Sequence, residues 1–224
     1  ELDEGKSTIL TDEKIEKIKK LSGTSWDVIG QGMMLRSSRP LVVFEGKTDV
    51  MYVKRAFEML KSRSDDYATL NVDFLNANGA GNVKSFIDNL KSFVPDSKKI
   101  IIFFDRDNAG KDGARAVTGI SKDDERVAHY QDIVQDNITT SFIPYKDGVT
   151  EGDFLIEDYF SWDDTIKAIV EDVIPDRKHP IKMLPNLPEK IKKELEKRIN
   201  RFTSDEFRGF IPLLDKIVEL TKVH

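Results

Sequence analysis

Two short apolar runs, each ending in an acidic residue, place the strongest constraint on how this chain folds. The first run is Leu41–Phe44, and Glu45 and Gly46 follow it directly. The second run is Ile100–Phe104, and Asp105 follows it. Apolar β-branched and aromatic residues without polar alternation are typical of strands whose two faces are both buried in a parallel sheet. We therefore expect both runs to be inner strands of an α/β fold.

The acids after these strands predict a metal site. Parallel strands present their carboxyl ends at one edge of a sheet, where ligands bind in open α/β folds. Asp105 and Asp107 are two residues apart, so in extended backbone both side chains point to one side, with Glu45 on a neighbouring strand. Carboxylates held so close repel each other unless a cation lies between them. Oxygen donors without His or Cys suit Mg²⁺ or Mn²⁺.

The order of predicted elements indicates a parallel sheet with crossover helices. Besides the two runs above, we expect strands at residues 70–75 and 139–143. Apolar residues at helical spacing predict helices at residues 49–60 and 83–93, and residues 108–113 read as a polar loop before a short helix. The predicted fold class is thus α/β, with a parallel sheet of about four strands flanked by helices.

The ends of the chain are predicted to be helical. Before the core, helical spacing predicts helices at about residues 11–21 and 24–34. After Pro144 the pattern changes to helices, which we place at residues 153–159, 165–173, 189–202 and 205–220. We therefore divide the chain into lead-in helices at 1–38, an α/β core at 39–146 and a C-terminal helical extension at 147–224.

Composition narrows the functional class. The 224 residues include no cysteine, which excludes a disulfide framework and a thiolate zinc site. No stretch has transmembrane length or a signal-peptide pattern, so we expect a cytoplasmic protein without a membrane partner. The net charge of −5 argues mildly against a general nucleic-acid-binding surface, but a metal-dependent nuclease site is itself acidic. Lysine and arginine crowd the last quarter of the chain.

Three further candidates each have a structural alternative. Asp49 follows Glu45 by four residues, and it is either a metal ligand or an acid that stabilises a helix start. The Asn78–Asn82 turn either leans its amides over a phosphate or only connects a strand to a helix. Asp153 and Glu157 share a face of a predicted helix, where they would bind a second metal or simply face solvent.

The Glu45-Gly46 turn and the Asp105-Arg106-Asp107 turn together resemble the two signature motifs of the Toprim domain, over roughly residues 39–146. Toprim domains occur in topoisomerases, primases, RecR-like proteins and the overcoming-lysogenization-defect (OLD) family of nucleases. Three features are similar to the C-terminal nuclease region of the OLD family. They are the lead-in Leu21–Val28, the paired acids Glu45 and Asp49, and the Leu155–Phe160 segment with a later lysine-rich helix.

The resemblance implies an Mg²⁺- or Mn²⁺-dependent endonuclease that hydrolyses phosphodiester bonds of DNA with two metal ions about 3.5–4 Å apart. It makes Asp105 the bridging ligand, with Glu45 and Asp107 completing the shells and Asp49 and Glu157 binding directly or through water. Asp153 joins the predicted metal ligands on the helix-face argument above. A lysine of the late helix assists catalysis in that family. We choose Lys193 from four candidates, which are Lys190, Lys192, Lys193 and Lys197. The resemblance to other Toprim enzymes also allows Glu45 to act as a general base instead of as a metal ligand.

The resemblance also implies partners. Such nucleases usually carry an ATP-binding cassette ATPase, but this chain has no Gly-x-x-x-x-Gly-Lys-Ser/Thr loop. We expect the ATPase on a missing preceding part, which the start at Glu1 favours, or on a separate subunit. A role in phage defence follows from the family analogy alone, and a homodimer stays open.

Two other classes compete with the nuclease. A non-catalytic Toprim module of the RecR-like kind would bind nucleic acid or protein partners, although the complete set of acids speaks against it. A receiver-type domain also holds Mg²⁺ between acids, but it places adjacent acids after its first strand. The tyrosines give no sign of a topoisomerase nucleophile, and the zinc module usual in primases is absent from the sequence.

Overall fold

The computed structural model describes residues 35, 37–91, 94–173 and 189–222. The chain divides into two compact units, Glu1–Ser37 and Ser38–His224, and the sheet with all its helices belongs to the second unit. The two helices predicted before residue 35 lie outside the described residues. The boundaries predicted at 38/39 and 146/147 stay predictions.

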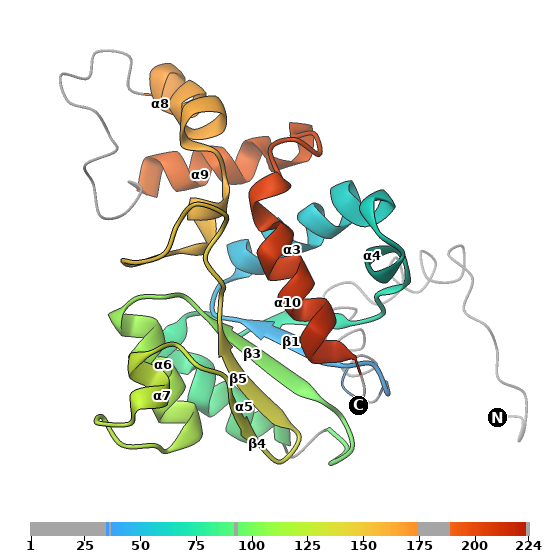
Figure 1. The fold of residues 1–224 in the computed structure, drawn as a ribbon, viewed down its shortest axis with the longest axis vertical. Helices are drawn as coiled ribbons and strands as arrows, with labels where there is room; N and C mark the ends of the chain where they lie inside the picture. Colours follow the sequence, from blue (N-terminus) through green and yellow to red (C-terminus); the bar gives the residue numbers. More distant parts are fainter. Residues whose placement is uncertain (1–34, 36, 92–93, 174–188, 223–224) are drawn as a thin grey trace, which may run out of the picture. The chain divides into compact units, whose positions relative to one another are not determined.

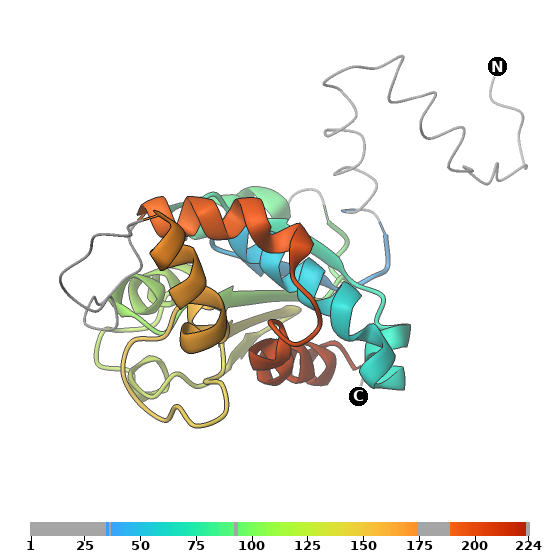
Figure 2. The same ribbon diagram turned by 90° about the horizontal axis from the view of Figure 1, so that it is seen from above.

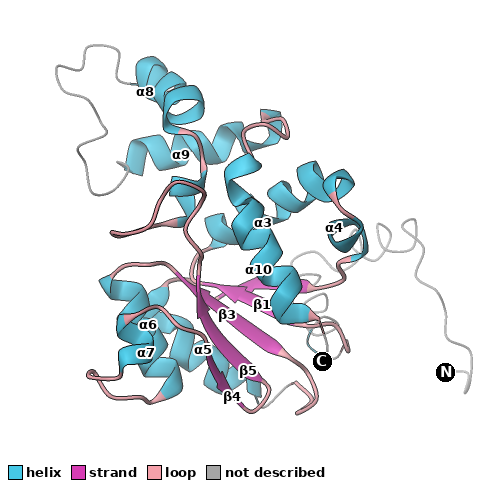
Figure 3. Ribbon diagram, in the orientation of Figure 1, coloured by secondary structure: helices cyan, strands magenta, loops and turns pink. Residues whose placement is uncertain are grey.

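The second unit contains a mostly parallel five-stranded sheet in the order β2-β1-β3-β5-β4 (Figures 1 and 3). Strands β1, β2, β3 and β5 are parallel to their neighbours, while β4 pairs antiparallel with β5. The strands are β1 Leu41–Phe44, β2 Asp73–Asn76, β3 Ile100–Phe104, β4 Ile133–Gln135 and β5 Ile138–Phe142. The predicted fold class, an α/β sheet flanked by helices with further C-terminal helices, is confirmed.

Helices cover both faces of this sheet (Figure 1). One face carries α5 Val83–Lys91, α6 Asn108–Thr118 and α7 Glu125–Ala128; the other carries α3 Lys47–Leu60, α4 Asp65–Thr69 and α10 Ile211–Thr221. Helices α8 Lys167–Val173 and α9 Glu189–Arg198 lie beyond the carboxyl edge, and Figure 2 shows α9 alongside α3. Short helical turns are η1 Lys61–Arg63, η2 Ala80–Asn82, η3 Ile156–Tyr159, η4 Trp162–Ile166, η6 Ile199–Arg201 and η7 Arg208–Phe210.

The two central strands are buried along their whole length, as their unbroken apolar runs predict. Every residue of β1 and β3 is at most 2% exposed. Alternate side chains, such as Phe44 and Phe103, point into the core shared with α3 and the C-terminal helices. Phe104 points to the other face, where it lies so close to Gly113 of α6 that a Cβ there would approach it to 2.4 Å.

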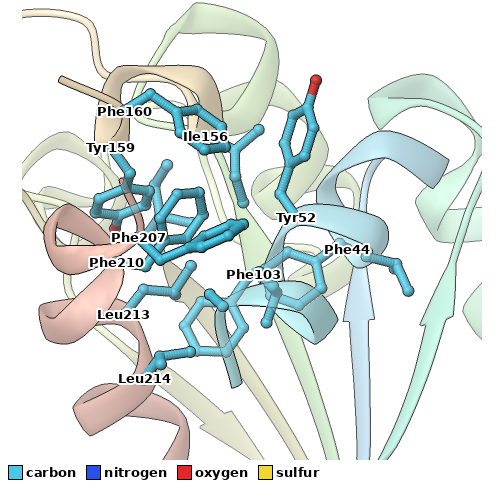
Figure 4. Close-up of a cluster of buried hydrophobic side chains, with 14 of the residues drawn as sticks. Phe44, Tyr52, Phe103, Ile156, Tyr159, Phe160, Phe207, Phe210, Leu213 and Leu214 are labelled. Carbon is cyan, nitrogen blue, oxygen red and sulfur yellow. The ribbon is translucent and has the colours of Figure 1, made fainter. Parts of the chain in front are cut away.

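An aromatic cluster joins the C-terminal extension to the sheet (Figure 4). Tyr159 ends η3 and Phe160 follows it, while Phe207 precedes η7 and Phe210 ends it. The rings of these residues pack together with centroids 4.9–5.8 Å apart. Leu213 and Leu214 of α10 extend this cluster toward Phe44 and Phe103. Because burial of each large aromatic side chain contributes about 1.5–3 kcal/mol, this contact fixes the extension against the core.

Several predicted elements are shifted. Strand β2 begins at Asp73 rather than at residue 70, and β4 was not predicted because its three residues give no alternation to detect. The predicted polar loop at 108–113 is wrong, since α6 begins at Asn108 with Asp107 as its N-cap. The predicted helix at 153–159 is also wrong: Phe154 pairs with Arg106 in a β-bridge, and only the short turn η3 follows.

The later helices keep their places but are interrupted. A π-helical turn precedes α8, and the predicted helix at 189–202 ends as α9 at Arg198 and continues as η6. The predicted start at residue 205 is wrong, because α10 begins only at Ile211, after η7. Helical spacing persists through these turns in the sequence, which is why the pattern does not reveal them.

Candidate metal site at the carboxyl edge of the sheet

Glu45 and Asp105 meet at the carboxyl ends of two neighbouring strands. Parallel pairing of β1 with β3 places the two ends side by side. The Oε1 atom of Glu45 accepts a hydrogen bond from the backbone N–H of Asp105 at 3.0 Å. A side chain from one strand end therefore fixes the backbone of the other, so the two acids are held as one unit.

Asp49 joins this unit from the first turn of α3. Its Oδ2 atom accepts a hydrogen bond from the backbone N–H of Gly46 at 2.7 Å, and the residue is 9% exposed. The carboxylate therefore stabilises the start of α3, as one of the two readings predicts, and it also lies near the acids after β1 and β3; its role as a metal ligand stays a prediction.

The C-terminal extension brings a fourth acid and a cation. Glu157 of η3 is 7% exposed, and its Oε1 atom lies 3.0 Å from the Nζ atom of Lys192 on α9. Lys192 is 29% exposed at its side chain. The extension therefore brings a buried acid and its partly exposed cation to the strand ends.

These groups line one cavity of about 310 Å³. It is bounded by the two strand ends, the start of α3, the turn before η2, the turn η3 and helix α9. Its lining residues are Glu45, Gly46, Thr48, Asp49, Gly79, Asp105, Glu157, Glu189, Lys192, Lys193 and Glu196. Four of the six predicted metal ligands thus meet in one space.

Asp107 and Asp153 lie outside this lining. The Oδ1 atom of Asp107 accepts a hydrogen bond from the backbone N–H of Gly110 at 2.7 Å, so this carboxylate caps α6. Its charge still acts on Glu45 and Asp105. Asp153 is exposed and precedes η3, so it does not share a helix face with Glu157 as predicted.

The predicted catalytic lysine, Lys193, lines the cavity but faces solvent. Its side chain is 66% exposed, and it pairs with Glu189 at 3.6 Å within α9. The neighbouring residue Lys192 is the one that pairs with a buried acid. Lys192 is among the four lysines that the sequence offers, but the sequence does not show which side of α9 faces η3, so it could not single out Lys192.

The site is electrostatically strained. Burial, together with the charges of Asp49 and Asp107, raises the pKa of Glu45 to about 7 in spite of the hydrogen bond from Asp105. Burial and the neighbouring acids raise the pKa of Asp105 well above its ordinary value. Burial also raises the pKa of Asp49. The carboxyl edge therefore resists carrying its full negative charge.

Lys192 relieves this strain in part. Burial opposes its charge, but Glu157 and then Asp105 and Asp49 favour it, so the pKa of Lys192 is raised. An unpaired donor lies nearby: the Tyr52 hydroxyl is buried and has no hydrogen-bond partner among the described residues. Its pKa is raised by burial and by the charges of Glu157, Glu196 and Asp49.

The donor set fits a hard divalent cation in its chemistry. The four acids offer only oxygen, and the raised pKa values of Glu45, Asp49 and Asp105 show that this space favours added positive charge. As placed, however, no three His, Cys, Asp or Glu side chains in the described ranges form a ready cluster of metal ligands. Glu45 and Asp49 each have an oxygen bonded to a backbone amide. Binding therefore requires these carboxylates to rotate or to use their second oxygens.

Comparison with known proteins assigns the class of domain. Residues 42–136 match the protein-family model described as Toprim-like. The chain therefore contains a Toprim-like domain that carries the Glu45 and Asp105 strand ends. Domains of this kind occur in nucleases, primases and topoisomerases, and they typically bind Mg²⁺. No curated protein and no solved structure matches the chain.

In the part of the chain that the structure describes, no helix has both the length and the apolar character needed to cross a bilayer.

Proposed function

We propose that this protein is a metal-dependent nuclease that hydrolyses phosphodiester bonds of DNA. The observation that carries the proposal is the meeting of Glu45, Asp49, Asp105 and Glu157, from four separate segments, in one cavity. Burying four acids together costs stability, so a fold that keeps them needs another reason for them. A divalent cation on a phosphate substrate supplies that reason.

Glu45, Asp49, Asp105 and Glu157 are the residues that would hold Mg²⁺ or Mn²⁺, with Asp107 adding negative charge from its capping position. When bound, such ions lower the pKa of a water molecule and stabilise charge on the phosphate and the leaving oxygen. Asp105 is the central member, because the charges of all three other acids raise its pKa and its own charge also acts on Lys192.

The protein's own groups have definite roles in this proposal. Glu45, with a pKa of about 7, is able to accept a proton near neutral pH, which suits a general base. Lys192 lies where it would face the phosphate, and its charge would stabilise the additional negative charge of the transition state. Lys193 at the cavity rim would contact the DNA backbone.

A non-catalytic module is the second candidate. The observation that favours it is the engagement of Glu45 and Asp49 with backbone amides, which gives these acids a structural role without any metal. In that case the chain would bind nucleic acid or protein partners without cleaving them, as RecR-like proteins do.

The wider setting is also a proposal. The paired acids and the appended helices support a place in an ATPase-coupled, OLD-type system, with the ATPase domain or subunit outside this chain and a role in phage defence. Co-expression with a candidate cassette ATPase, followed by size-exclusion chromatography, tests for the complex. The same column run on the chain alone tests for a homodimer.

Cleavage of supercoiled plasmid tests the central proposal. The protein is incubated with Mg²⁺, Mn²⁺ or EDTA, beside its Asp105→Asn and Asp112→Asn variants. Asp112 lies on α6 with 74% of its side chain exposed, so it controls for the loss of one charge nearby. We expect metal-dependent nicking or linearisation that Asp105→Asn abolishes and Asp112→Asn retains. Metal-independent cleavage, or equal cleavage by Asp105→Asn, would contradict the proposal; no cleavage by a folded protein in either metal would favour the non-catalytic module.

A further inference from the structure

Arg106 is held between two tyrosine rings beside the acid cavity. Its guanidinium carbon lies 4.7 Å from the ring centroid of Tyr130 and 4.4 Å from that of Tyr145. Its Nε atom donates to the backbone oxygen of Ile143 at 2.6 Å, and its backbone pairs with Phe154 in both directions. The guanidinium is thus fixed in place by groups that carry no negative charge.

A second cation shares one of these rings. The Nζ atom of Lys111, in the first turn of α6, lies 4.3 Å from the ring centroid of Tyr130. Cation–π contacts orient a cation without neutralising it. Among the described residues, neither the Nη atoms of Arg106 nor the Lys111 ammonium has a carboxylate partner, and the Tyr130 hydroxyl has no hydrogen-bond partner. These donors are therefore available to an anion from outside.

The place of Arg106 and Lys111 in the fold indicates the kind of anion that they suit. Arg106 lies between Asp105, which lines the cavity, and Asp107, which caps α6. A phosphodiester chain whose scissile phosphate lies at Asp105 must continue past the cavity, and this cluster offers a planar guanidinium and an ammonium at its side. In a chain with a net charge of −5, uncompensated cations beside an acidic cavity fit a polyanion better than a neutral partner.

We propose that Arg106, Lys111 and Tyr130, supported by Tyr145, bind a backbone phosphate of the nucleic acid that neighbours the phosphate cleaved at the acid cavity. This inference rests on the proposed function for its substrate. In this proposal the cluster positions the nucleic-acid strand, whereas the hydrolysis takes place at Asp105. Single-stranded nucleic acid is the form that fits best, because aromatic side chains beside cations are typical of its binding sites.

Fluorescence anisotropy of a labelled single-stranded DNA oligonucleotide, in EDTA to prevent cleavage, tests the cluster. The variants are Lys111→Glu and Tyr130→Phe. Lys61→Glu is the matched control, since Lys61 is an exposed lysine just after α3, a helix of 14 residues that begins at the acid cavity. An acid in the first turn of α6 is favourable for the helix, so Lys111→Glu is expected to fold.

We expect Lys111→Glu to weaken binding about tenfold and to reduce the slope of log K against log salt by about 0.7, the value for one single-strand phosphate contact. Tyr130→Phe removes only the hydroxyl and should weaken binding about twofold to threefold. Equal affinities for Lys111→Glu and Lys61→Glu would overturn this inference while leaving the nuclease proposal intact if the plasmid is still cut. Absence of oligonucleotide binding by the wild-type protein would also overturn this inference, whereas the nuclease proposal is decided separately by metal-dependent cleavage of the plasmid.

Discussion

The edge of the sheet where the parallel strands begin (the amino edge) and the edge where they end (the carboxyl edge) differ in how their acids are neutralised. At the amino edge, Asp73 is 3% exposed and lies 2.7 Å from Arg39 and 3.7 Å from Lys98, which also donates to the backbone oxygen of Arg39. At the carboxyl edge, four acids share a cavity in which Lys192 is the cation that pairs with a buried acid. One edge balances its buried acid with two cations, whereas the other gathers like charges.

This difference separates structural charge from functional charge. A buried acid with its own cations is compensated, and removing its negative charge destabilises the buried cation beside it. A buried acid among other acids weakens the fold until something positive arrives. The strained edge is also the edge where open α/β sheets bind ligands. The comparison therefore points to the carboxyl edge as the working site and to the amino edge as part of the scaffold.

The same substitution at the two edges should change stability in opposite directions. Asp73→Asn removes the negative charge that lies beside Arg39 and the 1%-exposed Lys98, and we expect a loss of about 3 kcal/mol in the free energy of unfolding. Asp105→Asn removes a strained carboxylate, and we expect a gain of about 1 kcal/mol near pH 8 without metal. Urea unfolding of both variants measures this, and changes of the same sign would break the comparison.

Stability of the metal-free protein should fall as pH rises. The folded state binds the Glu45 proton more tightly than the unfolded state does, because its pKa rises from 4.5 to about 7. The free energy of unfolding therefore decreases between those two values, by about 3 kcal/mol in total, and this contribution is level above them.

Urea titrations of the wild type and Glu45→Gln across that range check the pH dependence. The variant keeps an oxygen that accepts from the Asp105 amide but has no proton to lose, so its profile should be flatter. Parallel profiles for the two proteins would show that Glu45 is not strained.

Gly110→Ala should show how closely the Asp105 backbone is packed. A Cβ at Gly110 would lie 2.1 Å from the backbone oxygen of Asp105, so α6 or the strand end must move. We expect a loss of about 2–3 kcal/mol in the free energy of unfolding. Gly81→Ala is the control, since nothing lies within 4 Å of its added Cβ, and it should stay within about 0.5 kcal/mol of wild type. Equal effects would mean that Asp105 is not held by this contact.

Replacing Lys192 and replacing Lys193, which are neighbours on α9, should change the stability of the protein by different amounts. Lys192→Met leaves the buried Glu157 without its cation, and we expect a loss of about 1–2 kcal/mol. Lys193→Met removes a pair that is 66% and 73% exposed, and its effect should be near zero. Thermal unfolding of both variants at low salt compares them. A larger loss for Lys193→Met would place the wrong lysine at the acids.

Sequence reasoning was able to find the centre of the fold and of the site because both depend on short local patterns. The runs before Glu45 and Asp105 are apolar throughout, and parallel pairing then places their ends together. Asp107 does not line the cavity although its backbone is extended, because its carboxylate accepts from the Gly110 amide and caps α6; its role as a metal ligand stays a prediction. The i, i+2 rule gives the side on which a carboxylate lies but not the hydrogen bond that it makes.

The contributions of the C-terminal extension could not be predicted in detail for a different reason. Glu157 reaches the cavity from a single helical turn, and Lys192 reaches it from α9, across long-range contacts that no local pattern encodes. The sequence offered Lys190, Lys192, Lys193 and Lys197 as candidates, and no local pattern distinguishes Lys192 from the others. The cluster of Arg106 with Tyr130 and Tyr145 likewise joins three separate segments, so it was visible only in the structure.

Isothermal titration calorimetry with Mn²⁺ near pH 8 tests most directly whether the strained edge is a metal site. We predict that the wild-type protein binds Mn²⁺ and that Asp105→Asn, which removes the central acid without changing its shape, weakens binding at least about tenfold. Asp112→Asn should bind as the wild type does. No binding by the folded wild-type protein, or equal affinity in Asp105→Asn, would contradict the metal site, because the acids at this edge would then have no cation to balance them.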